Sequence, residues 1–245
     1  MSAPWLLLRG LMRDQRHWGP FLEQFRAAAG GAAVYAVDFA GNGARYQETS
    51  PASVAGLVAD LRAQLPKARG PWRVFALSLG AMVTVEWARR HPQELHSAVL
   101  VNTSLRPYSR VWERLQPRAW PRLLRTLAGG EDATGFEADL LALTSRHPAV
   151  DREALLADWV RWHRACPVSR ANGLRQLVAA ARYRAAPHPP AVPLRLLVGA
   201  GDQLVSPRCS ERLAAAWRLP LHRHPSAGHD LPLDAPDWVL RQLFS

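Results

Sequence analysis

The stretch Val74-Phe75-Ala76-Leu77-Ser78-Leu79-Gly80-Ala81 joins an apolar run that predicts a β-strand to a segment that predicts a helix. A serine at such a sharp strand-to-helix turn is held in a strained backbone conformation, with its hydroxyl projecting above the sheet. The residues two positions before and after it must be small, because larger side chains would collide in so tight a turn. Here they are Ala76 and Gly80. The pattern predicts that Ser78 is a nucleophile.

Two segments far along the chain supply partners for this serine. A serine hydroxyl is a poor nucleophile until a base removes its proton, and a histidine base needs a carboxylate that holds its tautomer. A glycine-rich turn after the apolar run Leu194–Val198 leads into Asp202, and His229 follows the last predicted strand. We therefore predict Ser78, Asp202 and His229 as a catalytic triad. Asp230 is the alternative carboxylate, although the chain neighbour of a histidine generally points elsewhere.

Short apolar runs alternate with longer amphipathic segments along most of the chain. The predicted strands are Trp5–Arg9, Ala33–Val37, Arg73–Leu77, Ser97–Val101, Leu194–Val198 and Leu219–His222. The predicted helices are Trp18–Ala29, Ser53–Gln64, Gly80–His91, Ser206–Trp217 and Pro236–Phe244. Nearly continuous apolar strands that alternate with helices predict an α/β fold with a mostly parallel, doubly wound sheet. The loops that follow the strands then lie along one edge, where we expect the three triad residues to meet.

The alternation stops between residues 105 and 185, where apolar residues recur at helical spacing and no strand is predicted. Asp151 is a candidate N-cap for one helix, and a second helix is expected at Ser169–Arg184. The earlier part of the segment is divided into short pieces by its prolines, Pro107, Pro117 and Pro121. We expect a core formed by residues 1–104 and 186–245, with a helical lid inserted at 105–185.

These motifs resemble the α/β-hydrolase family over almost the whole chain outside the lid. Arg9-Gly10 after the first predicted strand resembles the family's His-Gly oxyanion segment. The order Ser, Asp, His along the chain is also that of the family. The resemblance implies an oxyanion hole formed by the backbone N–H groups of Leu11 and Leu79. Arg9 replaces the family's usual histidine, which leaves the shape and charge of the pocket open.

The overall composition excludes several classes of protein. The chain has 245 residues, of which 48% are hydrophobic, and this suits one sizeable domain that buries its own core. Cys166 and Cys209 are too few and too isolated for a disulfide scaffold or a zinc site, so neither a metal nor another cofactor is expected. The apolar run Trp5–Leu8 is too short for a secretory signal or a membrane span. A cytoplasmic protein without a membrane span is expected.

Positive charge is the unusual feature of the composition. The net charge is +11, and all but one of the 31 basic residues are arginine. A nucleic-acid partner is not expected, because no nucleic-acid-binding motif accompanies the charge. Residues 105–185 hold fourteen arginines against eight acidic residues, with an arginine at every fourth position from 106 to 122. Two interpretations stay open: a solvated surface, or a docking site for an acidic carrier protein that delivers an acyl chain.

The predicted triad indicates hydrolysis of a carboxylic ester through an acyl-enzyme on Ser78, with a small-molecule acyl ester as substrate. The same residues also fit a thioesterase, an acyl-carrier methyl ester esterase, a C–C bond hydrolase or lyase, and a ligand-binding receptor without turnover. The tryptophans of the lid have two interpretations, packing in the lid or lining of an acyl pocket. They are Trp112, Trp120, Trp159 and Trp162.

Overall fold

The computed structural model describes residues 2–66, 70–128, 132–146 and 151–244 of the chain. Within these residues the strands form one six-stranded, all-parallel sheet with the order β2-β1-β3-β4-β5-β6. The strands are β1 Trp5–Leu8, β2 Val34–Val37, β3 Trp72–Leu77, β4 Leu95–Val101, β5 Leu194–Gly199 and β6 Leu221–His224. The predicted α/β class and parallel, doubly wound sheet are confirmed.

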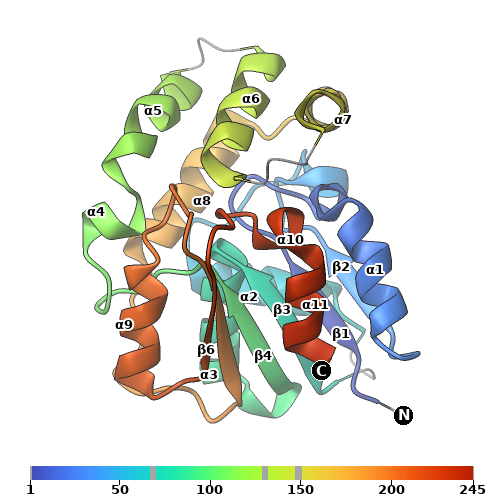
Figure 1. Cartoon of the computed structure of the whole chain (residues 1–245), viewed down its shortest axis with the longest axis vertical. Coiled ribbons are helices and arrows are strands. Elements are labelled where there is room, and N and C mark those ends of the chain that lie inside the picture. Colours follow the sequence, from blue (N-terminus) through green and yellow to red (C-terminus); the bar gives the residue numbers. More distant parts are fainter. Residues whose placement is uncertain (1, 67–69, 129–131, 147–150, 245) are drawn as a thin grey trace.

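Helices cover both faces of this sheet (Figure 1). One face packs against α2 Val54–Gln64, α3 Leu79–Arg90 and α9 Arg208–Trp217, and the other against α1 Pro20–Ala28 and α11 Pro236–Phe244. Strand β1 shows the division, because Leu6 and Leu8 belong to the first core cluster while Leu7 packs in the second with Phe25 and Phe75. Burial on both faces explains why the strands are apolar at consecutive positions.

A helical insertion between β4 and β5, called the lid below, lies over one end of the sheet (Figure 1). Its helices are α4 Val111–Arg114, α5 Trp120–Ala128, α6 Ala133–Thr144, α7 Arg152–Ala165 and α8 Arg170–Arg182, with a 3-10 turn at Pro117–Ala119. Asp151 caps α7 as predicted, since its side chain accepts a hydrogen bond from the N–H of Ala154. The prediction lacked α6, which Asp132 caps in the same way. The domain boundaries stay a prediction, and the expected lid includes residues 129–131 and 147–150, which lie outside the described residues.

Strand β6 begins two residues later than the predicted Leu219–His222. The N–H of Leu219 donates to the carbonyl of Ala214, so Leu219 belongs to the turn that ends α9. Leu221–His224 then pairs with β5 at the end of the sheet. As an edge strand, β6 has one unpaired side and none of its residues is fully buried, which is why the polar sequence His-Arg-His is tolerated there. The ring of His224 also accepts a hydrogen bond from the N–H of Ala227, at 2.9 Å.

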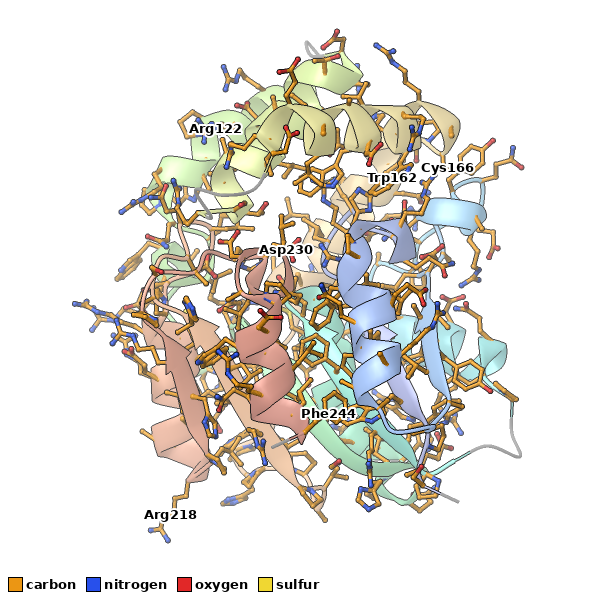
Figure 2. The ribbon with its side chains drawn as sticks, turned by 45° about the vertical axis from the view of Figure 1, so that its right-hand side comes forward. Arg122, Trp162, Cys166, Arg218, Asp230 and Phe244 are labelled. Atoms are coloured by element: carbon orange, nitrogen blue, oxygen red, sulfur yellow. The ribbon has the colours of Figure 1, made fainter. Side chains whose placement is uncertain are left out.

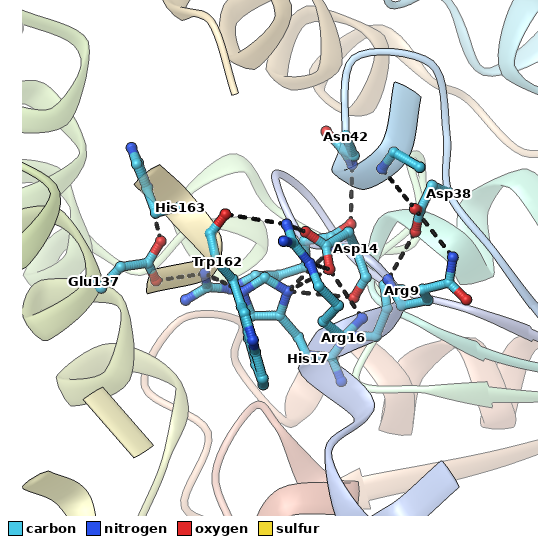
Figure 3. Close-up of polar contacts among 12 residues, drawn as sticks. Arg9, Asp14, Arg16, His17, Asp38, Asn42, Glu137, Trp162 and His163 are labelled. Atoms are coloured by element: carbon cyan, nitrogen blue, oxygen red, sulfur yellow. Dashed lines mark hydrogen bonds and ion pairs between the residues drawn. The ribbon is translucent and has the colours of Figure 1, made fainter. Parts of the chain in front are cut away.

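A buried cluster of charged side chains holds the lid against the loop after β1 (Figure 3). Arg13, from this loop, donates to the carboxylate of Glu137 in α6 at 2.6 Å. The second oxygen of Glu137 lies 2.9 Å from Nδ1 of His163 in α7. The guanidinium of Arg13 also stacks over the ring of Trp159, at 4.2 Å from its centroid. Two lid helices are therefore fixed to one short segment of the core by charge and by stacking.

His17 adds a titratable group to this lid–core contact. Its ring packs edge-on against Trp159 and Trp162 of the lid, with centroids 5.5 and 5.3 Å apart. Burial, reinforced by the positive charge of Arg13, lowers the pKa of His17 from 6.5 to about 4. The unfolded chain therefore takes up a proton at this position at a pH where the folded protein does not.

This shift predicts an acid-sensitive fold. Because the folded pKa of His17 is depressed, its stabilising effect is present above pH 6.5 and is lost as the pH falls toward 4. We expect His17→Gln to reduce the fall in melting temperature over that interval. The exposed His96 provides the control, and His96→Gln is expected to retain the full fall. Thermal unfolding followed by circular dichroism measures both, and identical pH profiles for His17→Gln and the unchanged protein would contradict the assignment.

Candidate active site

Ser78 occupies the turn between β3 and α3 with φ 56° and ψ −113°. A positive φ is uncommon for a residue with a side chain, so the predicted backbone strain at this serine is present. Gly80 shows why a small residue is needed two positions later. A Cβ at Gly80 would lie 2.7 Å from the carbonyl oxygens of Leu8 and Arg9, so the nearest collision is with the end of β1.

Asp202 and His229 meet at the end of the neighbouring strands β5 and β6. One carboxylate oxygen of Asp202 lies 2.7 Å from Nδ1 of His229, and both side chains are almost fully buried. The other oxygen accepts hydrogen bonds from the N–H groups of Leu204 and Val205, at 2.8 and 2.9 Å. The carboxylate is thereby fixed, and the imidazole ring turns its Nδ1 toward it. Nε2 is then the ring nitrogen that can act as a base.

Asn102 organises this corner of the site, and the sequence did not reveal it. Located after β4 with φ 45°, it donates from its amide nitrogen to the carbonyls of Gly228 and His229, at 3.0 and 2.8 Å. Its amide oxygen accepts from the N–H of Gly199 at 2.9 Å. Asn102 therefore joins the ends of β4 and β5 to the loop that carries His229. An asparagine that follows an apolar strand is the only sequence signal, and it is weak.

The histidine loop is also fixed to the lid. The carboxylate of Asp234 accepts hydrogen bonds from the N–H of Gly228, at 2.7 Å, and from the hydroxyl of Ser145, at 2.6 Å. The N–H of Arg146, directly after α6, donates to the same carboxylate at 2.7 Å. The position of His229 thus depends on contacts with β4, β5 and the end of α6.

The loop after β1 approaches Ser78 closely. A Cβ added to Gly10 would lie 3.2 Å from the Cβ of Ser78. Leu11 follows in this loop, and Leu79 is the first residue of α3, whose N–H has no partner within the helix. Both residues line the same cavity as Ser78. The structure places both candidate oxyanion residues beside Ser78, and their role as donors stays a prediction.

Ser78 and His229 share a cavity of about 470 Å³ between the sheet edge and the lid. This volume is in the range of small-molecule binding sites. Most of the lining is apolar, and it comes from the core and from α4, α6 and α8 of the lid. The apolar residues include Leu11, Met12, Leu79, Met82, Val111, Leu115, Phe136, Leu140, Leu143, Leu177, Leu204 and Val205.

The expectation that the lid tryptophans line this cavity is wrong for the described lining, which contains none of them. Trp112 and Trp120 are exposed by 54% and 44%, because α4 and α5 turn these side chains toward solvent. Trp159 and Trp162 belong to α7, which lies beside the loop after β1 and packs on His17. The apolar part of the described lining consists of aliphatic and methionine side chains together with Phe136 instead.

Arginines of the lid reach the same cavity. Arg106, Arg114 and Arg122 belong to its lining, and Arg122 forms an ion pair with Asp139 at 3.0 Å. Burial and the nearby charge of Arg106 lower the pKa of Arg114. Figure 2 shows Arg122 on the lid and Asp230 in the interior below it. The arginines at every fourth position therefore differ in their surroundings, since Arg110 and Arg118 lie outside the described lining of the cavity.

Among the residues that the structure describes, no group of three or more His, Cys, Asp or Glu side chains is placed to hold a metal ion. Burial raises the pKa of the Cys209 thiol to about 11, which keeps it protonated at neutral pH. The described helices also include none with the length and apolar character needed to cross a bilayer.

A parallel sheet of this order, a strained serine after β3 and a helical insertion after β4 define an α/β-hydrolase. Solved structures support the fold assignment. The enol-lactonase from Burkholderia xenovorans LB400 is 21% identical with a TM-score of 0.79, over 99% of this chain and 90% of that one. A thermophilic esterase from Thermogutta terrifontis is 20% identical with a TM-score of 0.76, over 99% and 88%.

The chain belongs to the serine aminopeptidase, S33 family of hydrolases (Hydrolase_4), whose family model matches residues 13–235. A curated relative is the pimeloyl-[acyl-carrier protein] methyl ester esterase of Aromatoleum aromaticum. It is 30% identical over 201 residues, which cover 77% of this chain and 78% of the relative. The protein is thus similar to hydrolases that include esterases.

The position of Asn102 generates a test of the site. Asn102→Ala leaves the N–H of Gly199 and the carbonyls of Gly228 and His229 without their partner. Unsatisfied buried polar groups cost roughly 1–3 kcal/mol each, so we expect a lower melting temperature. The candidate base His229 also loses a backbone anchor, so any Ser78-dependent turnover should fall further than stability alone explains. A folded variant with unchanged melting temperature and turnover would show that these bonds do not position the loop.

Proposed function

We propose that this protein hydrolyses carboxylic esters through an acyl-enzyme on Ser78. The observation that carries the proposal is the 2.7 Å contact between Asp202 and Nδ1 of His229, in the cavity that Ser78 also lines. A buried carboxylate that holds a histidine in a cavity shared with a half-buried serine is an arrangement that suits acyl transfer. Membership of a hydrolase family and the likeness to an esterase support the same chemistry.

In this mechanism His229 removes the proton from the Ser78 hydroxyl as its oxygen attacks the ester carbonyl. The N–H groups of Leu11 and Leu79 stabilise the negative oxygen of the tetrahedral intermediate. His229 then donates the proton to the leaving alcohol, and the acyl group remains on Ser78. A water molecule, deprotonated by His229, releases the acid. Asp202 orients the imidazole and stabilises its charged form throughout.

The cavity favours an apolar acyl group of small or medium size. Its volume of about 470 Å³ and its aliphatic lining suit a short hydrocarbon chain rather than a polar or peptide substrate. Thioester cleavage, C–C bond hydrolysis and binding without turnover would use the same residues. Multiple turnover of simple esters separates ester hydrolysis from binding without turnover.

The experiment is turnover of p-nitrophenyl esters of increasing acyl length by the unchanged protein and by Ser78→Ala. We expect Ser78→Ala to lower kcat by roughly a thousandfold or more while the melting temperature stays the same. Ser210→Ala is the matched control, since Ser210 is a buried serine outside the described cavity lining. Full activity in Ser78→Ala refutes the proposal. A single burst of product from the unchanged protein would favour a receptor.

A second candidate function is cleavage of a methyl ester on an acyl chain that an acidic carrier protein presents. The relative from Aromatoleum aromaticum carries this activity in its name. In this chain, Arg118, Arg122 and Arg125 surround a surface hollow, and Arg122 also lines the cavity. A cationic surface continuous with the cavity suits an acidic protein whose tethered acyl chain enters beside it.

Salt dependence tests the carrier candidate. With an acidic acyl-carrier protein bearing a methyl-esterified acyl chain, we expect kcat/KM to fall several-fold between about 0.02 and about 0.2 M salt, because exposed charges are screened. Arg118→Glu should lower kcat/KM for the carrier-bound ester and leave the turnover of p-nitrophenyl esters unchanged. Arg218→Glu is the control, since Arg218 is exposed at the end of the molecule opposite the lid (Figure 2). Salt-independent kcat/KM, or equal effects of both variants, would exclude docking at the lid.

A further inference from the structure

Arg9 and Asp230 form a buried ion pair that the proposed mechanism does not use. The two guanidinium nitrogens Nη1 and Nη2 donate to the two carboxylate oxygens, at 3.2 and 2.6 Å. The side chains are only 2% and 4% exposed. The guanidinium also stacks over the ring of Trp18, at 4.6 Å from its centroid. This bidentate geometry, supported by stacking, fixes both partners in one arrangement.

The pair connects the two loops that hold opposite sides of the candidate site. Arg9 is followed directly by Gly10 and Leu11, the segment that approaches Ser78. Asp230 directly follows His229, and both members of the pair line the same cavity as the serine. A displacement of either loop would therefore change the distance between the candidate oxyanion donor and the candidate base.

Stability alone does not account for such a pair. The desolvation of two buried charges offsets most of their attraction, and apolar replacements of a whole buried pair are often neutral or stabilising. Burial works against ionisation of Asp230, but the charge and hydrogen bonds of Arg9 outweigh it and keep the pKa of Asp230 below its ordinary value. Asp230 is thus a full negative charge next in the chain to His229, and Arg9 is the cation that neutralises it.

The balance of charge around His229 depends on this neutralisation. Asp202 contacts the ring of His229 from the loop after β5, and Asp230 lies on the same loop as His229. Arg9 and Arg13 approach from the loop after β1, where both charges act on Asp230. Without Arg9, the cation that keeps Asp230 ionised is gone, and burial favours the neutral, protonated carboxyl. Without Asp230, Arg9 would remain an uncompensated cation, which disfavours the protonated, inactive form of His229.

We propose that Arg9 and Asp230 are a positioning pair for the reaction. Their ion pair holds the oxyanion loop against the histidine loop, and it cancels the charge beside His229 so that Asp202 alone acts as the orienting carboxylate. The inference rests on the proposed role of Ser78 as nucleophile, and it assigns a function to the arginine that replaces the usual histidine.

The test is the pH dependence of p-nitrophenyl ester turnover in Arg9→Gln and Asp230→Asn. In Asp230→Asn we expect the acidic limb of the pH profile of kcat/KM to move to lower pH, because Arg9 stays charged. In Arg9→Gln, where burial neutralises Asp230, we expect this limb to stay in place. Both variants should lose about tenfold or more in kcat with a smaller change in KM, because small displacements of reacting groups slow catalysis strongly. A purely structural pair would not move the acidic limb in Asp230→Asn while leaving it in place in Arg9→Gln.

The double variant Arg9→Gln/Asp230→Asn completes the test. It buries no unpaired charge, so it is expected to fold even where a single variant does not. Its acidic limb should return to that of the unchanged protein, while its kcat stays reduced because the two loops are no longer joined. Arg62→Gln is the control, since Arg62 forms a bidentate ion pair with Glu94 outside the cavity lining. It should alter neither kcat nor the limb.

Two results would overturn the positioning role. One is an acidic limb that stays in place or moves to higher pH in Asp230→Asn. The other, decisive where the single variants do not fold, is a folded double variant with the kcat of the unchanged protein. Ser78→Ala, measured alongside, separates the two proposals. If activity survives Ser78→Ala, the proposed function is refuted. If activity depends on Ser78 but the Arg9 and Asp230 variants behave like the unchanged protein, only the positioning role is refuted.

Discussion

The close approach of Gly80 to the end of β1 is the constraint on which the site depends. Since a Cβ there would meet the carbonyl oxygens of Leu8 and Arg9 at 2.7 Å, the serine turn can touch the loop after β1 only because this position has no side chain. Parallel pairing of β1 with β3 supplies the alignment, because it brings the carboxyl ends of both strands to one edge. The pairing of the two strands is therefore enough to bring Ser78 and the loop that carries Leu11 together.

Each remaining part of the site is added to that edge by another strand. Asn102 follows β4, Asp202 follows β5 and His229 follows β6, so the three are neighbours because their strands are. The amide of Asn102 satisfies backbone groups in both adjacent segments. The lid completes the enclosure, held by the ion pair between Arg13 and Glu137. The sheet provides the geometry, and the lid provides an apolar space above it.

What could be predicted from the sequence was local or periodic. The strand–serine–helix context of Ser78, the apolar strands and the cap at Asp151 depend on residues close in the chain, and the structure agrees with them. The bounds predicted for β6 were two residues too early, because an edge strand needs no apolar run to mark its position. The contacts of Asn102 and the partner of Arg9 could not be predicted, because they join segments 97 to 221 residues apart and leave no periodic signal.

The ion pair between Arg9 and Asp230 also has a consequence for how this sequence can change over evolution. Replacing either residue alone leaves a buried charge without its counter-charge, which is far more costly than replacing both. The two positions are therefore coupled, although almost the whole chain separates them. Lineages that carry histidine at the first position are expected to carry an uncharged residue at the second. The arginine and the aspartate would then occur together in one subgroup of the family and be absent together from the others.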